Sequence, residues 1–212
     1  MTDFSKITAL YHINGPDGFT LDELEPVRSI FGAIPQALID YYTELGRYDF
    51  NQNQDSLSTP KDYQSGQRNT DDHLIIYAEN QWSCVWGIHK DDVGDPDPPV
   101  YFSSDEKTWV RECETTTAFL HAMAYLQAIF YLDYHSDAFY ELEEDDVEFV
   151  KKHYRDKGVS LRNWTTGIAF FGNNDDQIIM LMGGEEQCAY SSMDETEFHE
   201  LDQILSKLGS PM

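Results

Sequence analysis

The stretch LIIYAENQWSCVWGI, residues 74–88, has the clearest structural signal in the chain. Residues 74–77 are β-formers, and residues 82–86 alternate large apolar side chains with smaller ones. Two such runs separated by a few polar residues predict a strand–turn–strand hairpin. The polar residues between the runs have two interpretations: they hold a tight turn by bonding to nearby backbone groups, or they bind a ligand. These residues are Glu79, Asn80 and Gln81.

Two helices are predicted before the hairpin, over residues 24–31 and 35–45. Both have a Pro near the start and a Gly just past the end, which is the usual asymmetry of helix termini. Residues 47–73 follow and are rich in Asn, Gln, Ser and Asp. Their composition predicts a long loop, with a turn of helix after Pro60.

Strands and helices follow the hairpin in mixed order. A third strand is predicted at residues 100–102, followed by a helix that Thr115 or Thr116 can cap. A helix over residues 143–157 is expected to end at Gly158. The remaining elements are strands at 167–171, 177–182 and 188–192, and an amphipathic helix capped by Asp194. Because no low-complexity linker interrupts this order, the sequence predicts a single α+β domain spanning residues 1–212.

The charge balance is strongly acidic. The chain has 14 Lys and Arg against 39 Asp and Glu, which gives a formal net charge of −25. Such a surface repels nucleic acid and anionic membranes, and it attracts a basic protein partner. Two interpretations remain open from charge alone: recognition of a basic partner, and solubility.

The three cysteines, Cys84, Cys113 and Cys188, are widely spaced and form no CxxC motif. We expect reduced thiols rather than a zinc or dithiol site. The N-terminal sequence lacks the basic start and apolar stretch of a signal peptide, and no apolar run reaches the roughly 18–20 residues of a membrane span. The sequence therefore predicts a cytoplasmic protein with no membrane partner.

Two acidic segments are the candidate partner-binding residues. The loop DDVGDPDPP contributes Asp91, Asp92, Asp95 and Asp97, and the run ELEEDDVE contributes Glu143, Glu144, Asp145 and Asp146. The first segment lacks the glycine and glutamate positions of an EF-hand, so we expect no calcium site and no other metal. The second segment has two interpretations: a solvated helix start, which the helix dipole favours, and a docking surface.

Motifs of enzymes are missing from the sequence. It contains no nucleophile elbow, no phosphate-binding loop and no HExxH pair. We therefore expect neither catalytic residues nor a cofactor. An exposed Trp beside acidic residues would serve instead as an interface anchor.

Several of these segments together resemble a known family. They are IPQALIDYYTELG (residues 34–46), ENQWSCVWGI (79–88), DPPVYF (97–102) and the later Trp109. Their order and spacing resemble the Smi/Knr-type branch of the SUKH superfamily, over about residues 24–130. The resemblance implies an α+β fold with a twisted, mostly antiparallel sheet flanked by helices. It also implies that Glu79–Gln81 form the turn between two central strands.

The resemblance also implies a class of function. Many bacterial members are immunity proteins that bind and neutralise toxins, often nucleases, and fungal relatives are regulators that act through protein contacts. We therefore expect a non-enzymatic, acidic binding protein that neutralises a basic toxin. A regulatory or scaffold adaptor is the alternative, and an enzyme without a known motif is a third. Fold similarity does not identify the partner.

Overall fold

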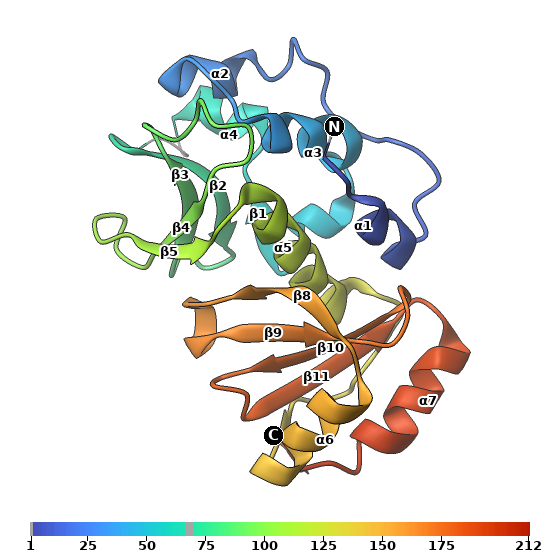
Figure 1. Ribbon diagram of the computed structural model, residues 1–212. Coiled ribbons are helices and arrows are strands. Elements are labelled where there is room, and N and C mark those ends of the chain that lie inside the picture. Colours follow the sequence, from blue (N-terminus) through green and yellow to red (C-terminus); the bar gives the residue numbers. More distant parts are fainter. Residues whose placement is uncertain (1, 67–69) are drawn as a thin grey trace. The chain divides into compact units, whose positions relative to one another are not determined.

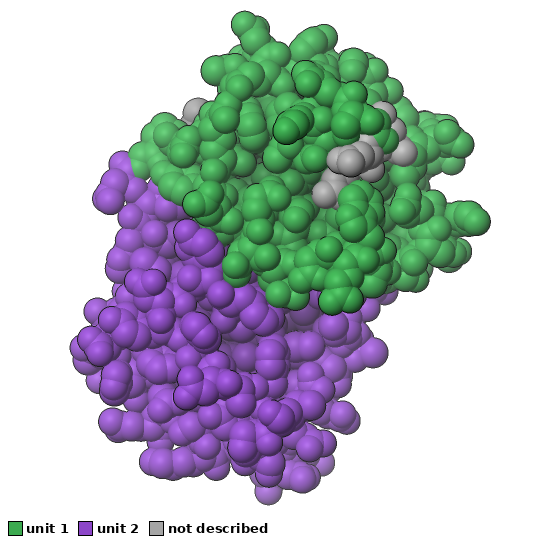
Figure 2. Space-filling model, turned by 180° about the vertical axis from the view of Figure 1, so that it is seen from behind, with its two compact units in different colours: residues 1–3, 15–120 green, residues 4–14, 121–212 purple. Residues whose placement is uncertain are grey.

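The computed structural model describes residues 2–66 and 70–212 and confirms the predicted α+β class (Figure 1). Within these residues there are seven α-helices, and the strands form two antiparallel sheets instead of one. The chain divides into two compact units, shown in green and purple in Figure 2. Unit 1 comprises the described residues of 1–3 and 15–120, and unit 2 comprises residues 4–14 and 121–212. A single folding domain over residues 1–212 stays a prediction.

The sheet of unit 1 has the strand order β1-β2-β3-β4-β5, and every neighbouring pair is antiparallel. Its strands are β1 (Asp55–Leu57), β2 (His73–Glu79), β3 (Val85–His89), β4 (Val100–Ser103) and β5 (Val110–Cys113). The predicted hairpin is therefore present as β2 and β3. The ring of Phe119 contacts the rings of Tyr77 and Trp86, at centroid distances of 6.0 Å, and so covers one face of these two strands.

The Glu79–Gln81 segment is a structural turn. The Glu79 carboxylate accepts hydrogen bonds from the backbone N–H of Gln81 at 2.8 Å and of Ser83 at 3.1 Å, and from the Ser83 hydroxyl at 3.0 Å. Because these bonds hold the turn closed, β3 begins at Val85, three residues later than predicted. Trp82 is left in the turn at φ 60°, with 49% of its surface exposed.

Three helices of unit 1 follow the sequence signals. They are α2 (Glu25–Phe31), α3 (Gln36–Leu45) and α4 (Pro60–Ser65), the last being the helical turn expected after Pro60. Gly32 ends α2 at φ 79°, a backbone conformation that a residue with a Cβ rarely adopts. The fourth helix, α5 (Thr116–Tyr131), contains the boundary between the two units, which falls after Leu120.

The prediction of a long loop over residues 47–73, with a turn of helix after Pro60, is right about the helical turn and wrong where a 3-10 helix and a strand form. The segment contains a 3-10 helix, η1 (Asp49–Gln52), as well as β1 and α4, and residues 67–69 lie outside the described residues. Its polar side chains are used inside the fold. Asn51 is fully buried, accepts a hydrogen bond from the Tyr41 hydroxyl at 2.7 Å and donates one to the Leu45 carbonyl at 2.6 Å. A polar composition therefore does not mark this segment as loop.

The sheet of unit 2 has the strand order β12-β7-β11-β10-β9-β8, and β6 also pairs with β11. Its strands are β6 (Tyr134–His135), β7 (Tyr140–Glu141), β8 (Asp156–Leu161), β9 (Ile168–Phe171), β10 (Gln177–Met182), β11 (Gln187–Ser192) and β12 (Ser210–Pro211). Figure 1 shows α6 (Glu144–His153) and α7 (Glu195–Leu205) beside this sheet. A continuous apolar core links the two helices to the sheet through residues such as Val150, Tyr190 and Leu201.

The predicted end of the helix near residue 143 is wrong. Helix α6 ends at His153, and Gly158 lies at φ 78° inside β8 instead of after a helix. Residues 156–161 form their hydrogen bonds with β9, and the register shifts between Asp156 and Ser160. Gly158 therefore allows a local irregularity in strand β8. The helix ends earlier because residues after His153 pair with β9 instead of continuing the helical hydrogen bonds.

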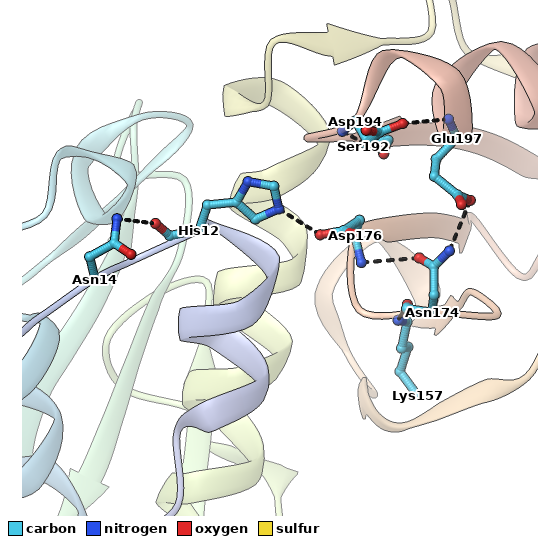
Figure 3. A network of polar contacts seen from close by, with 8 residues as sticks. All are labelled: His12, Asn14, Lys157, Asn174, Asp176, Ser192, Asp194 and Glu197. Atoms are coloured by element: carbon cyan, nitrogen blue, oxygen red, sulfur yellow. Dashed lines mark hydrogen bonds and ion pairs between the residues drawn. The ribbon is translucent and has the colours of Figure 1, made fainter.

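The first residues of the chain belong to unit 2. Helix α1 (Ser5–Leu10) is followed by Tyr11, whose hydroxyl donates to the Ala124 carbonyl at 2.6 Å. His12 Nε2 lies 2.7 Å from Asp176 Oδ1, in a polar network that continues through Asn174 to Glu197 of α7 (Figure 3). No helix within the described residues is long and apolar enough to cross a membrane.

Candidate functional site

The acidic loop of unit 1 is partly structural. Asp97 Oδ1 accepts a hydrogen bond from the Thr117 backbone N–H at 2.8 Å, at the start of α5, and Asp95 Oδ1 accepts one from the Asp97 N–H at 3.0 Å. These two carboxylates therefore hold the loop and cap a helix. Asp91 is exposed, with Oδ2 3.7 Å from His89 Nδ1, and Asp92 is half-buried.

The acidic segment of unit 2 is also divided in its roles. Glu143 is the N-cap of α6, and it forms a capping box with Asp146, whose Oδ2 accepts the Glu143 N–H at 3.2 Å. Glu144 and Asp145 lie in the first turn and are exposed. Acidic residues at this end interact favourably with the helix dipole. The expected helix start is thus present, and two of its four carboxylates remain directed to solvent.

An acidic groove of about 530 Å³ lies beside this helix start. We define the acidic groove by its charged lining, which comes from β7, from α6 and its N-cap, and from the turn between β10 and β11. The charged lining consists of Glu141, Glu143, Glu144, Glu148, Lys151, Glu185 and Glu186. Leu142 and Val147 supply its apolar part. Among the described residues that line it, Lys151 is the one basic side chain opposite six glutamates.

The wall opposite α6 is shaped by an unusual turn. Gly183, Gly184 and Glu185 have φ values of 67°, 77° and 76°, so three successive residues adopt the left-handed conformation. Lys151 Nζ lies 2.5 Å from Glu185 Oε2, and this ion pair joins α6 to the turn. The Leu142 N–H donates to the Glu186 carbonyl at 2.8 Å, and this bond joins the residue after β7 to the same turn. The groove is therefore held on both sides by bonds within unit 2.

Charge and shape give the groove a defined chemistry. Glu185 is paired with Lys151, and the other five glutamates of the lining are exposed. Such a surface attracts cationic groups and repels phosphates. It is suited to a lysine or arginine side chain presented by another protein, and it lacks the apolar enclosure typical of small-molecule sites.

The sequence identified part of this site and missed the rest. Glu143 and Glu144 were predicted as binding residues and line the groove, whereas Asp145 and Asp146 do not belong to its lining. Glu185 and Glu186 were missed because they follow the core strand β10 after Gly183–Gly184, where a simple turn was expected. The two consecutive acids at that turn were the available signal.

The hypothesis of one large patch built from both acidic segments stays a prediction. Asp91, Asp92, Asp95 and Asp97 belong to unit 1, and Glu143, Glu144, Asp145 and Asp146 belong to unit 2. Over the residues that the structure describes, no group of three or more His, Cys, Asp or Glu side chains is placed to hold a metal ion. Cys84, Cys113 and Cys188 are all buried, and no disulfide joins them.

Comparisons of this chain with family models, with curated proteins and with solved structures return no match.

Proposed function

We propose that this chain is a non-enzymatic, cytoplasmic binding protein that recognises a basic protein partner through the acidic groove of unit 2. The observation that carries the proposal is the set of six glutamates around a groove with one lysine. Long-range attraction to so many carboxylates accelerates the encounter with a basic surface.

Within that class, the function proposed is that of a bacterial immunity protein of the SUKH type. A nuclease toxin binds phosphates with basic residues, so an acidic groove competes for the same residues that the toxin uses on its substrate. Neutralisation then needs no turnover, because an occupied toxin surface cannot contact nucleic acid. The net charge of −25 supports this proposal, as does the resemblance of residues 24–130.

The experiment measures association and dissociation rates with the basic toxin encoded by an adjacent gene, at about 20 mM and about 300 mM salt. The groove variant combines Glu144→Gln, Glu148→Gln and Glu186→Gln, which are exposed and outside the capping box. A matched control combines changes of equal charge at exposed sites of unit 2 outside the groove: Asp137→Asn, Glu195→Gln and Glu200→Gln.

We expect the groove variant to associate about 10-fold or more slowly at low salt, and the difference to shrink at high salt because ions screen the attraction. The association rate of the control variant should fall much less. Tight binding that responds neither to salt nor to the groove variant would contradict the proposal, and it would assign recognition to an apolar surface.

A further inference from the structure

The sheet of unit 1 has a second face, opposite the one that Phe119 covers. A small apolar cluster of Ile75, Ala78 and Val85 lies there, with Trp109 packed against it. Next to this cluster the His73 ring stacks on the Trp109 ring, with 3.8 Å between centroids and 9° between planes. The two rings therefore form a flat aromatic stack on a sheet face that is separate from the main core.

Neighbouring side chains fix this stack. The rings of His89 and Tyr101 approach His73 edge-on, at centroid distances of 5.0 Å and 5.7 Å. Gly87 leaves room on the adjacent strand, because a Cβ at that position would lie 3.0 Å from the Leu74 carbonyl oxygen and 3.2 Å from the His73 Cβ. Side chains from strands β2, β3 and β4 therefore hold the His73 ring in its position against Trp109.

His73 has a buried polar atom that the fold does not use. The side chain is 5% exposed, and its Nδ1 has no hydrogen-bond partner among the described residues. Burial lowers the pKa of His73 to about 4, with the nearby His89 acting in the same direction, so the ring is neutral at physiological pH. Buried polar atoms without partners are rare in folded proteins, and a ligand is one way in which they are satisfied.

A cavity of about 500 Å³ opens at the stack, and its wall is acidic. Besides His73 and Trp109 it is lined by Asp71, Asp72, Glu106 and Lys107. Asp72 is paired with Lys90. Neither Asp71 nor Glu106 has a basic side chain within 4 Å in the part of the chain that the structure describes, and both are exposed.

Two arginines of the same chain bind to this combination of groups, whereas Lys157, whose Nζ lies 6.0 Å from the Tyr125 ring centroid, donates to the Asn174 carbonyl and not to a carboxylate. The guanidinium of Arg47 lies 4.4 Å from the centroid of the Phe19 ring and 2.5 Å from a Glu23 oxygen. The guanidinium of Arg111 lies 5.9 Å from the Tyr101 ring and 3.0 Å from Glu114. In both places an aromatic ring and a carboxylate together bind an arginine. Among the residues that the structure describes, the cavity presents the same two groups and no arginine lines it.

We propose that this cavity accepts an arginine side chain of a protein partner, with its guanidinium against the half-buried Trp109 ring and its N–H groups donating to Asp71 and Glu106. A planar guanidinium stacks on aromatic rings and donates in a fixed fork, whereas an ammonium does neither as well. Phosphate-bearing ligands are disfavoured by the three carboxylates. The basic character of the partner rests on the proposed function, but the cavity itself does not.

The experiment titrates a probe peptide, N-acetyl-Gly-Arg-Gly-amide, into the full chain at low salt. Binding is followed by NMR at the His73 imidazole and the Trp109 indole N–H. Two peptides of the same length serve as comparisons: one with citrulline, the neutral isostere of arginine, and one with lysine. The test variant combines Asp71→Asn and Glu106→Gln, which leaves the aromatic stack in place. Trp82→Ala, at an exposed tryptophan of the same unit, is the matched control.

We expect millimolar binding of the arginine peptide with shifts at His73 and Trp109, about 5- to 30-fold weaker binding of the citrulline peptide, and intermediate binding of the lysine peptide. The variant that combines Asp71→Asn and Glu106→Gln should bind the arginine peptide more weakly by a similar factor, and Trp82→Ala should bind it with unchanged affinity. Equal affinity for arginine and citrulline, an unaffected double variant, or shifts confined to unit 2 would each overturn the proposal. Because no toxin enters this titration, its failure is distinguishable from failure of the proposed function.

Discussion

Asp55 and Glu79 form a buried pair of carboxylates at the edge of the unit 1 sheet. They lie opposite each other in the antiparallel pairing of β1 with β2, and they are only 1% and 7% exposed. Burial raises the pKa of Asp55 to about 7, with the charge of Glu79 as the second cause. The thiol of Cys84 and the buried Glu112 are the other titratable groups of this cluster. We predict that Asp55→Asn removes a pH-dependent loss of stability.

The sign follows from proton binding. Between pH 4 and pH 7 the folded state keeps the Asp55 proton, whereas the unfolded chain has released it at its ordinary pKa of 3.8. The free energy of unfolding therefore falls as pH rises through this window and levels off above pH 7. The interval from 3.8 to about 7 corresponds to at most about 4 kcal/mol. Relaxation and water entry around the ionised carboxylate reduce this, so we expect about 2–4 kcal/mol.

The assay is urea unfolding of both proteins at pH 5 and pH 8, followed by tryptophan fluorescence. Trp82, Trp86 and Trp109 all lie in unit 1, so the signal reports mainly on the unit that contains Asp55. At pH 5 the unfolded wild type has already released the Asp55 proton while the folded state keeps it, so the variant should already be more stable by roughly a third of the full effect, about 1 kcal/mol. At pH 8 the variant should be more stable by about 2–4 kcal/mol, which is about 4–16 °C in Tm for a chain of this size.

The matched control is Asp91→Asn, which removes one charge from an exposed position of the same unit. Exposed substitutions of this kind change stability by about 0.5 kcal/mol or less. The reasoning is refuted if the stability difference between wild type and Asp55→Asn is the same at pH 5 and pH 8. A variant that is less stable at both pH values would show that Asp55 contributes as a carboxylate, through hydrogen bonds that outweigh its burial.

Three further predictions concern packing, capping and thiols. Gly18→Ala should destabilise the protein by more than about 2 kcal/mol in urea unfolding, because the new Cβ would lie 2.1 Å from the Thr43 carbonyl oxygen; a neutral result would show that the backbone yields there. Asp194→Ala should cost about 0.5–2 kcal/mol, because the side chain caps α7, and an unchanged midpoint would contradict that role. Burial raises the pKa of both Cys84 and Cys188 to about 12, so these thiols should react with an aromatic disulfide reagent only after unfolding; labelling of either within minutes in the native state would speak against this.

The sequence alone determined the elements that depend on near neighbours. The hairpin of β2 and β3, the start and end of α2, and the Asp194 cap of α7 were all predictable, because each is decided by residues within about five positions. The α+β class followed from the order of these elements. The net charge of −25 also came from the sequence.

Contacts between distant segments decided the rest. Strand β1 exists because β2 offers an edge to pair with, and α6 ends at His153 because the following residues pair with β9. The same applies to the acidic residues. Asp97 became a helix cap through Thr117, twenty positions away, while Glu185 and Glu186 joined Glu143 and Glu144 around one groove. The sequence shows where the carboxylates lie along the chain. Only the contacts between distant segments decide which of them form hydrogen bonds within the fold and which face the solvent.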